Sequence, residues 1–577
     1  MSAETTSALR QAVRAYYRLD ETTVVDELVD KARFTPAEQQ RILARARPLV
    51  QAIRASRQNS GGIEAFLNTY DLSSREGVVL MCLAEALLRI PDSETVDLLI
   101  RDKIGHTDWA GRLGASHSTF VNAGTWALML TGRIVTLDPA DKNLGHTVKR
   151  LIARVGEPVI RQAITTAMRI LGRQFVMGRN IDEALERSRR GEKHGYRHTF
   201  DMLGEAARLA ADALHYFETY SQAIEAIGAA ADDRPALEAP SVSIKLSALH
   251  PRFEVANAAR MRSELLPAVK TLARKAKRFG IGFTIDAEEM DRLELSLDLI
   301  EALALDHELA GWDGLGMAVQ AYQKRALPII DWLADLAQRS RHRFGLRLVK
   351  GAYWDAEIKL TQERGLSDYP VFTRKASTDV SYLACAKRLF ADPVAFYPAF
   401  ATHNAHTLAA IAEIAGDNNE WEYQRLHGMG EEMYDAVVGA GKGGKRGRAC
   451  RVYSPVGSHE DLLAYLVRRL LENGANSSFV NRIADAELPI EDLVADPVER
   501  VAALAVKPHP GIPLPRKLFG SERANSEGLD LSDEATLARL RQAIAASAAV
   551  GYRAAPTVPM LGGDSLPGEG RPVLSPA

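Results

Sequence analysis

The sequence has few cysteines, no long apolar run and no large excess of positive or negative charge. Its 577 residues include three cysteines, Cys82, Cys385 and Cys450, which are too few and too scattered for a disulfide framework or a paired-cysteine metal site. No run reaches the roughly 18 apolar residues that cross a bilayer, and the first residues lack the apolar core of a secretory signal. The net charge of −2 gives no basic footprint for nucleic acid. These absences predict a cytoplasmic protein, and they leave peripheral contact with a membrane open.

The composition is that of ordinary globular proteins, with 46% hydrophobic and 25% charged residues. Up to about residue 190 the pattern predicts only helices, which we divide into an arm over 1–60 and a helical domain with its connection over 61–190. Strands and helices alternate over 191–485. We expect a helical and loop segment over 486–554, and a linker rich in proline and glycine over 555–577.

Eight short apolar or β-branched runs after residue 195 predict strands, and a helix-length pattern follows each of them. The runs are 196–203, 241–246, 282–287, 315–320, 345–349, 397–403, 423–426 and 450–456. Eight strand–helix units favour a parallel (βα)8 barrel of the TIM type, although alternation alone also permits a doubly wound sheet. The predicted fold class is therefore α/β, with an all-helical arm and domain before the barrel.

Polar residues stand at the carboxyl ends of most of the predicted strands. They are Lys245, Asp286, Gln320, Lys350, His403 and Asn404. Active sites of such barrels lie at these strand ends. One polar residue there is expected by chance, but a polar residue on most strands favours a functional site over a solvated edge.

The helix predicted over 461–473 carries a second group of polar residues. Its apolar stripe leaves Tyr465, Arg468, Arg469 and Glu472 on the opposite face. A solvated polar face alone would explain this pattern. However, the helix follows the eighth strand and so lies beside the barrel mouth, where two guanidinium groups suit a carboxylate and Glu472 suits an amine. Together they favour an amino-acid substrate.

Several long motifs resemble the proline dehydrogenase module of the bifunctional flavoenzyme proline utilization A. They include DMLGEAA, SIKLSALHPR, IDAEEMDRLELSLDL, RLVKGAYWDAEIK, ATHNAHTLA and VYSPVGSHEDLLAYLVRRLLENGANSSFVNRI, and the resemblance runs from about residue 61 to the end. It implies oxidation of L-proline to Δ1-pyrroline-5-carboxylate, the first step of proline catabolism to glutamate. The hydride passes to N5 of a non-covalent FAD and the electrons pass to a membrane quinone. The last residues resemble the start of an aldehyde dehydrogenase half that uses NAD, so we expect the chain to be cut before that half.

The resemblance also implies roles for individual residues. Three cations hold the substrate carboxylate: Arg468, Arg469 and Lys245. The remaining residues near the substrate and flavin N5 are Glu472, Asp286, Tyr353, Tyr453, Leu426 and Arg347. Glu472 orients the clamp, Asp286 supports it, and Arg347 lies beside N5. The segments that contact FAD contribute Gln320, Arg347, Val349, Lys350, Gly351, Ala352, Trp354, Arg374, Lys375, Thr402, His403, Asn404 and Gln424.

Two other classes of protein remain as weaker alternatives. A metal-dependent barrel hydrolase is suggested by His403 and His406, but lysine and arginine at the strand ends would repel a metal ion. A DNA-binding regulator is suggested because some long family members begin with a ribbon-helix-helix domain, but residues 1–50 contain no strand before two basic helices. We therefore predict no metal site and no nucleic-acid partner. The oligomeric state and the identity of the quinone stay open.

Overall fold

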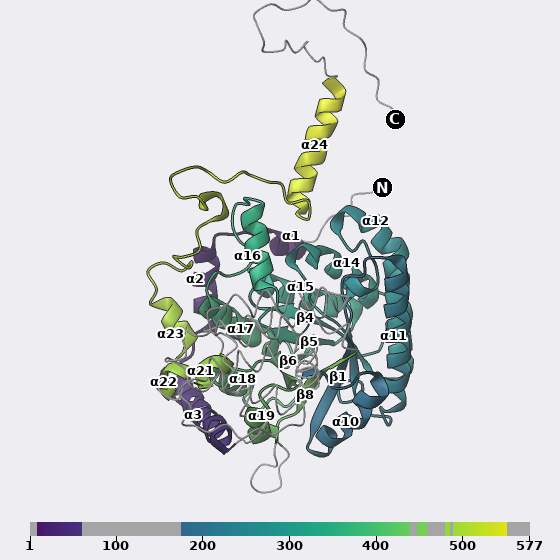
Figure 1. The fold of residues 1–577 in the computed structure, drawn as a ribbon, viewed down its shortest axis with the longest axis vertical. Helices are drawn as coiled ribbons and strands as arrows, with labels where there is room; N and C mark the ends of the chain where they lie inside the picture. The colour runs from purple at the N-terminus through teal and green to yellow at the C-terminus, as the bar shows by residue number, and fades with distance from the viewer. Residues whose placement is uncertain are drawn as a thin grey trace, which may run out of the picture.

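A closed barrel of eight parallel strands forms the centre of the molecule (Figure 1). The computed structural model describes residues 8–59, 175–438, 447–457, 465, 479–484 and 488–550. The strands are β1 (Tyr196–Met202), β2 (Ser241–Ile244), β3 (Gly282–Ile285), β4 (Leu315–Gln320), β5 (Phe344–Val349), β6 (Phe396–Ala401), β7 (Glu422–Leu426) and β8 (Cys450–Val456). Each pairs with the next along the chain, and β8 pairs with β1. The predicted barrel is confirmed, and the closing pair rules out the doubly wound sheet.

Four predicted strands end later than the observed strands, and for β1 the difference is a single residue. The first residue after β2 is Lys245, the first after β3 is Asp286, and the first after β6 is Thr402. Directly after Lys245 the chain enters a short 3₁₀ helix, η1 (Leu246–Ala248). The hydrogen-bonded ladder therefore ends where these polar residues begin, and this places them in the loops at the barrel mouth.

Helices surround the barrel (Figure 1). They are α10 (Ile181–Lys193), α11 (Ala210–Ala229), α13 (Leu266–Arg278), α14 (Leu293–Ala304), α15 (Ala326–Ser340), α16 (Trp354–Glu363), α17 (Lys375–Phe390), α18 (Ala405–Ala415) and α19 (Glu431–Val438). In α13, for example, Val269, Leu272, Ala273 and Ala276 are buried at helical spacing. Its last turn carries basic residues, which suit the negative end of the helix dipole.

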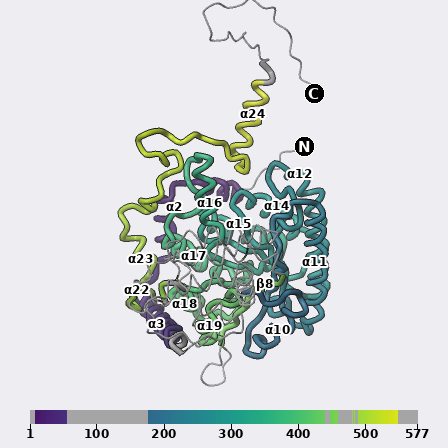
Figure 2. The backbone as a smooth tube through the Cα atoms, in the orientation of Figure 1, coloured from purple at the N-terminus to yellow at the C-terminus, as the bar shows by residue number. Residues whose placement is uncertain are grey.

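The N-terminal arm crosses the outside of the barrel and is coloured purple in Figures 1 and 2. It consists of α1 (Ala8–Ala15), α2 (Glu21–Ala32) and α3 (Pro36–Asn59). These helices pack against α15, α17 and α18 respectively. The arm is thus fixed to the helical ring over much of its length.

The C-terminal segment returns to the same side of the barrel. It contains α21 (Phe479–Ala484), α22 (Ile490–Leu493), α23 (Pro497–Ala502) and α24 (Glu534–Val550), and α23 packs on both α17 and α2. Figure 1 shows α24 projecting away from the barrel. Among the described helices, none has both the length and the apolar composition to cross a membrane.

The amino ends of the strands are closed by a buried ion pair. Arg451 of β8 donates to Glu422 of β7 at 2.6 Å, and its other nitrogens reach the carbonyl oxygens of Leu237 and Ala239. Both side chains are almost fully buried. At this end of a barrel such a network stabilises the fold, so the chemistry is to be sought at the opposite end.

Candidate functional site

A cluster of buried charged groups lies at the carboxyl ends of the strands. Lys245 Nζ donates to Asp201 Oδ2 at 2.8 Å and to Asp286 Oδ2 at 3.4 Å. The hydroxyl of Tyr453 lies 2.7 Å from Asp201 Oδ2 and 2.6 Å from Asp286 Oδ2. Arg347 Nη1 donates to the other oxygen of Asp286. The structure therefore brings together four residues predicted from the sequence and adds Asp201.

The two cations and the two carboxylates of this cluster balance in charge. Burial acts to lower the pKa of Lys245, but the negative charges around it, Asp201 foremost, raise that pKa well above its usual range. Burial raises the pKa of Tyr453 well above its usual range. Lys245 is therefore an ammonium and Tyr453 a neutral phenol at any ordinary pH.

Arg347 is held on every side of its guanidinium group. Its Nε donates to Gln424 Oε1 at 2.7 Å and its Nη2 donates to Ser243 Oγ at 2.8 Å. Its third bond goes to Asp286, and the ring of Tyr453 lies 5.0 Å away. Because these partners come from β2, β7 and β8 and from the loop after β3, the barrel itself fixes the position of this cation.

Asp201 was not among the predicted site residues, although it is the first residue of the DMLGEAA motif. It is fully buried in β1 and is the nearest partner of Lys245. Burial raises its pKa, while the charge of Lys245 opposes that shift. Its Oδ1 has no hydrogen-bond partner among the described residues. The available signal was a single acidic residue near the end of an otherwise weakly charged strand.

A second buried network joins the loops after β1, β2 and β3. Glu288 accepts from the backbone N–H of Ser247 at 3.1 Å and from the Ser247 hydroxyl. Ser247 Oγ in turn accepts from Ala206 N at 2.9 Å. Burial raises the pKa of Glu288 to about 7, against the attraction of Arg292. The loops that carry Lys245 and Asp286 are thus tied to each other beside the charged cluster.

The predicted cofactor residues form an arc over β4 to β7. Lys350 pairs with Asp379, which also lies 3.5 Å from Lys375. Asn404 caps α18 by accepting from Thr407 N at 3.0 Å, and His403 Nε2 accepts from Leu426 N at 3.3 Å. Val349, Ala352 and Tyr353 lie around the turn from β5 into α16, and Thr402 follows β6. The arc contains both cations and helix starts.

Two features of this arc fit a bound flavin nucleotide. Gln320 is 2% exposed, yet its Oε1 has no hydrogen-bond partner among the described residues. Gly351 is exposed and has a φ of +137°, and a Cβ there would lie 2.4 Å from the ring of Tyr322. An unused acceptor and an exposed stretch of backbone that only glycine permits suit a large ligand with its own hydrogen-bond donors.

Apolar residues line the side of the site next to β7 and β8. Leu426 and Tyr453 pack against a buried cluster that contains Tyr465, Phe175 and Leu203. Tyr465 belongs to the helix predicted over 461–473. The other three polar residues predicted on that helix, Arg468, Arg469 and Glu472, lie outside the described residues. Tyr453 and Leu426, which were predicted to lie near the substrate, thus border this apolar cluster.

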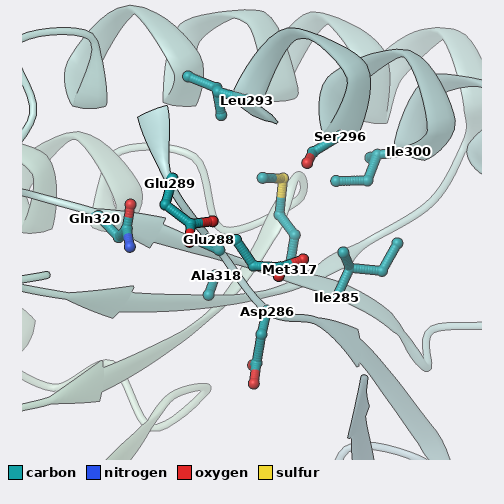
Figure 3. Close-up of a pocket in the computed structure, with 11 residues that line it drawn as sticks. Ile285, Asp286, Glu288, Glu289, Leu293, Ser296, Ile300, Met317, Ala318 and Gln320 are labelled. Carbon is teal, nitrogen blue, oxygen red and sulfur yellow. The ribbon is translucent and has the colours of Figure 1, made fainter. Parts of the chain in front are cut away.

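A small cavity lies behind the strand ends, between β3, β4 and α14 (Figure 3). Its volume is about 10 Å³, enough for a single water molecule. Asp286 lines it, but its carboxylate points away from Leu293, Ser296 and Ile300 of α14 (Figure 3). The charged cluster therefore faces the barrel interior, and this cavity is not the cofactor site.

Three family models match the chain. One described as proline dehydrogenase matches residues 184–482, and one described as the proline utilization A proline dehydrogenase N-terminal domain matches residues 7–54. A model described as the DNA-binding domain of proline dehydrogenase matches residues 62–175, of which only Phe175 belongs to the described residues.

The sequences of similar proteins align with almost the whole chain. The bifunctional protein PutA of Salmonella typhimurium is 52% identical over 99% of this chain, which spans 44% of that protein, and the PutA of Rhizobium meliloti is also 52% identical, with 46% of its length covered. A crystal structure of a Bradyrhizobium japonicum proline utilization A variant is 45% identical, with a TM-score of 0.72 over 92% of this chain and 53% of that one. The chain therefore spans about half the length of these relatives.

The pH dependence of stability should reveal the buried proton of Glu288. Its pKa is raised from 4.5 to about 7, so the folded state keeps a proton that the unfolded state loses as the pH rises between these values. The contribution of Glu288 to the free energy of unfolding is fully present below pH 4.5 and falls by up to about 3 kcal/mol as the pH passes 7. Glu288→Gln removes this titration.

Chemical denaturation of both proteins between about pH 4.5 and 8 measures the effect. The stability of the wild type should decline relative to Glu288→Gln as the pH rises. Glu218→Gln, an exposed change on α11, is the control and should keep the wild-type slope. Parallel curves for the wild type and Glu288→Gln would contradict the prediction.

Proposed function

Because the chain belongs to the proline dehydrogenase family, we propose that it oxidises L-proline to Δ1-pyrroline-5-carboxylate, with FAD as the bound electron acceptor. The electrons then pass to a membrane quinone. The observation that carries the proposal is the buried, charge-balanced cluster of Lys245, Arg347, Asp201 and Asp286, which lies within the matched region. It supplies fixed cations where an amino acid and a reducible cofactor would meet.

The substrate carboxylate would be held by Arg468, Arg469 and Lys245, with Glu472 orienting the arginines. Lys245 suits this role because its ammonium is permanently charged and is itself anchored by Asp201. Ion pairs at the carboxylate fix the orientation of the ring, so binding energy is used to align the bond that breaks. Tyr353, Tyr453 and Leu426 would enclose the ring and exclude water from it.

FAD, when bound, supplies a two-electron acceptor for the hydride on the carbon next to the substrate amine. The residues that would hold it are Gln320, Arg347, Val349, Lys350, Gly351, Ala352, Trp354, Arg374, Lys375, Thr402, His403, Asn404 and Gln424. Arg347 would stabilise negative charge on the reduced cofactor, because its guanidinium is fixed in place before the reaction. Gln320 offers its unused amide oxygen as an acceptor.

Location and the second enzymatic step also belong to this proposal. A quinone acceptor requires contact with a membrane, so we propose a cytoplasmic protein that associates with the membrane peripherally. The relatives are named bifunctional, and this chain spans 44% of the first of them. That an aldehyde dehydrogenase half using NAD carries out the second step stays a prediction.

The visible spectrum of the purified protein tests the function directly. We expect bound FAD, bleaching of its absorbance when proline is added, and accumulation of Δ1-pyrroline-5-carboxylate that an aminobenzaldehyde reagent traps. A colourless protein that FAD does not reconstitute would refute the proposal. A zinc content of about one per chain in such a protein would favour the metal-dependent hydrolase instead.

The arginine clamp makes a separate kinetic prediction. Arg468→Met or Arg469→Met should raise the apparent KM for proline about ten- to a hundredfold, because a lost charge-assisted contact costs roughly 1.5–3 kcal/mol. FAD content should barely change. Arg482→Met, in the neighbouring helix α21, is the matched control and should keep the wild-type KM. Unchanged proline kinetics in either clamp variant would remove that arginine from the clamp.

DNA is a second candidate ligand, because the model matching residues 62–175 is described as a DNA-binding domain. The net charge of −2 and the missing strand before two basic helices predict the opposite. We therefore expect no sequence-specific retardation of promoter DNA in a gel at moderate salt. Retardation that resists salt and depends on sequence would establish DNA binding and overturn this expectation.

A further inference from the structure

Residues 370–374, which lead into α17, are held by parts of the chain that are far apart in sequence. On one side they pair with the turn after β4. Lys324 N donates to the carbonyl oxygen of Pro370 at 3.1 Å, and Phe372 N donates to that of Tyr322 at 2.8 Å. Trp354 Nε1 donates to the carbonyl oxygen of Phe372 at 2.8 Å. We call residues 370–374 the cofactor stretch, because Arg374 is expected to contact FAD.

The N-terminal arm reaches the cofactor stretch through Glu21. This residue begins α2, directly after Asp20, whose side chain caps the helix. Glu21 Oε1 accepts from the backbone N–H of Thr373 at 2.9 Å. A second contact anchors the arm nearby, since Lys324 Nζ donates to the carbonyl oxygen of Leu19 at 2.7 Å. An acceptor more than 350 positions away thus satisfies a backbone donor of the stretch.

The C-terminal segment holds the same stretch from another direction. His509 N donates to Thr373 Oγ1 at 2.8 Å, and Arg374 Nε donates to the carbonyl oxygen of Lys507 at 2.8 Å. The helices α2 and α23 both pack against α17, on the side of the barrel where Figure 1 draws them together. Thr373 is therefore fixed between the two ends of the described chain.

Burying the carboxyl group of Glu21 costs free energy that an apolar side chain in a packing contact would not cost. Its side chain is 1% exposed, and its Oε2 has no hydrogen-bond partner among the described residues. Burial raises its pKa, although Lys324 opposes the shift. An arm that only covered apolar surface would place an apolar side chain there. The carboxylate is explained if the backbone at Thr373 must be held in one position.

The start of α17 shows why that position matters. Arg374 is the N-cap of α17 and Lys375 its first residue, and none of the described side chains caps the helix. Two cations at a helix N-terminus add to the positive end of the dipole instead of offsetting it. Such an end suits an anionic group, and the diphosphate of FAD is the anion that the proposed function supplies.

We propose that Glu21 is a positioning residue for the flavin site, so that the N-terminal arm is part of the machinery that binds the cofactor. Glu21 acts through the Thr373 N–H on Arg374 and Lys375. This inference rests on the proposed function. It adds to that function a requirement that residues near the N-terminus be docked before FAD binds tightly.

The test uses the full chain stripped of flavin and titrated with FAD, followed by the quenching of flavin fluorescence. Glu21→Ala should raise the Kd for FAD roughly tenfold or more, because it removes a charge-assisted acceptor. Glu21→Gln keeps an acceptor oxygen and should stay within about threefold of the wild type. The Tm of each apoprotein is measured alongside. A Glu21→Ala variant with wild-type affinity, or a Glu21→Gln variant as weak as Glu21→Ala, would overturn the proposal.

Arg10→Met provides the matched control for general loosening of the arm. Arg10 is also a buried charge of the arm, but it joins α1 to Glu294 and Asp298 on α14. Arg10→Met should lower the Tm and leave the Kd for FAD unchanged. If Arg10→Met raised the Kd as much as Glu21→Ala does, the effect of Glu21 would be explained by stability alone. If Glu21→Ala does not fold, Glu21→Asp retains the charge and withdraws the acceptor by one methylene group. Wild-type affinity in Glu21→Asp would then refute the inference, whereas a wild-type chain that binds no FAD refutes the proposed function instead.

Discussion

The requirement that buried charges be paired governs the centre of this protein. Lys245 and Arg347 are almost fully removed from water, and each unpaired cation there would cost several kcal/mol. Asp201 and Asp286 neutralise them, and the hydroxyl of Tyr453 bridges the two carboxylates. If one member of the cluster moved, a buried charge would lose its partner. The cations therefore hold fixed positions before any ligand binds. Fixed charges of this kind are what orientation and electrostatic stabilisation require.

The barrel makes such a cluster possible because each member comes from a different part of the sheet. Asp201 comes from β1, Arg347 from β5 and Tyr453 from β8, while Lys245 and Asp286 follow β2 and β3. Parallel strands direct all their carboxyl ends to one mouth. The network of Glu288 and Ser247 then joins the loops beside the cluster. At the other mouth the pair of Arg451 and Glu422 closes the barrel, so stability and chemistry occupy opposite ends.

Periodicity was sufficient to predict the eight strands, and β4 and β8 have the predicted bounds. Strand ends were less accurate at β2, β3 and β6, because apolar pattern does not show where hydrogen bonding stops. The strand-end rule selected Lys245 and Asp286, which do meet. It missed Asp201, because an acidic residue one position before the end of a strand looks the same in sequence whether it faces water or a buried lysine. Arg468, Arg469 and Glu472 lie outside the described residues, so their roles stay predictions.

The contacts of the arm show a further limit of reading a sequence locally. Nothing in the residues around Glu21 indicates that its carboxylate is buried, since a glutamate in the first turn of a helix is favourable on the surface. Its role depends on the backbone N–H of Thr373, which follows directly after residues that pair with the turn after β4 through two backbone hydrogen bonds. Each buried backbone N–H and C=O of a loop needs a partner, and a side chain supplies it where no backbone group does. For the Thr373 N–H that partner comes from outside the barrel, so a unit defined by the eight strands alone would lack this contact.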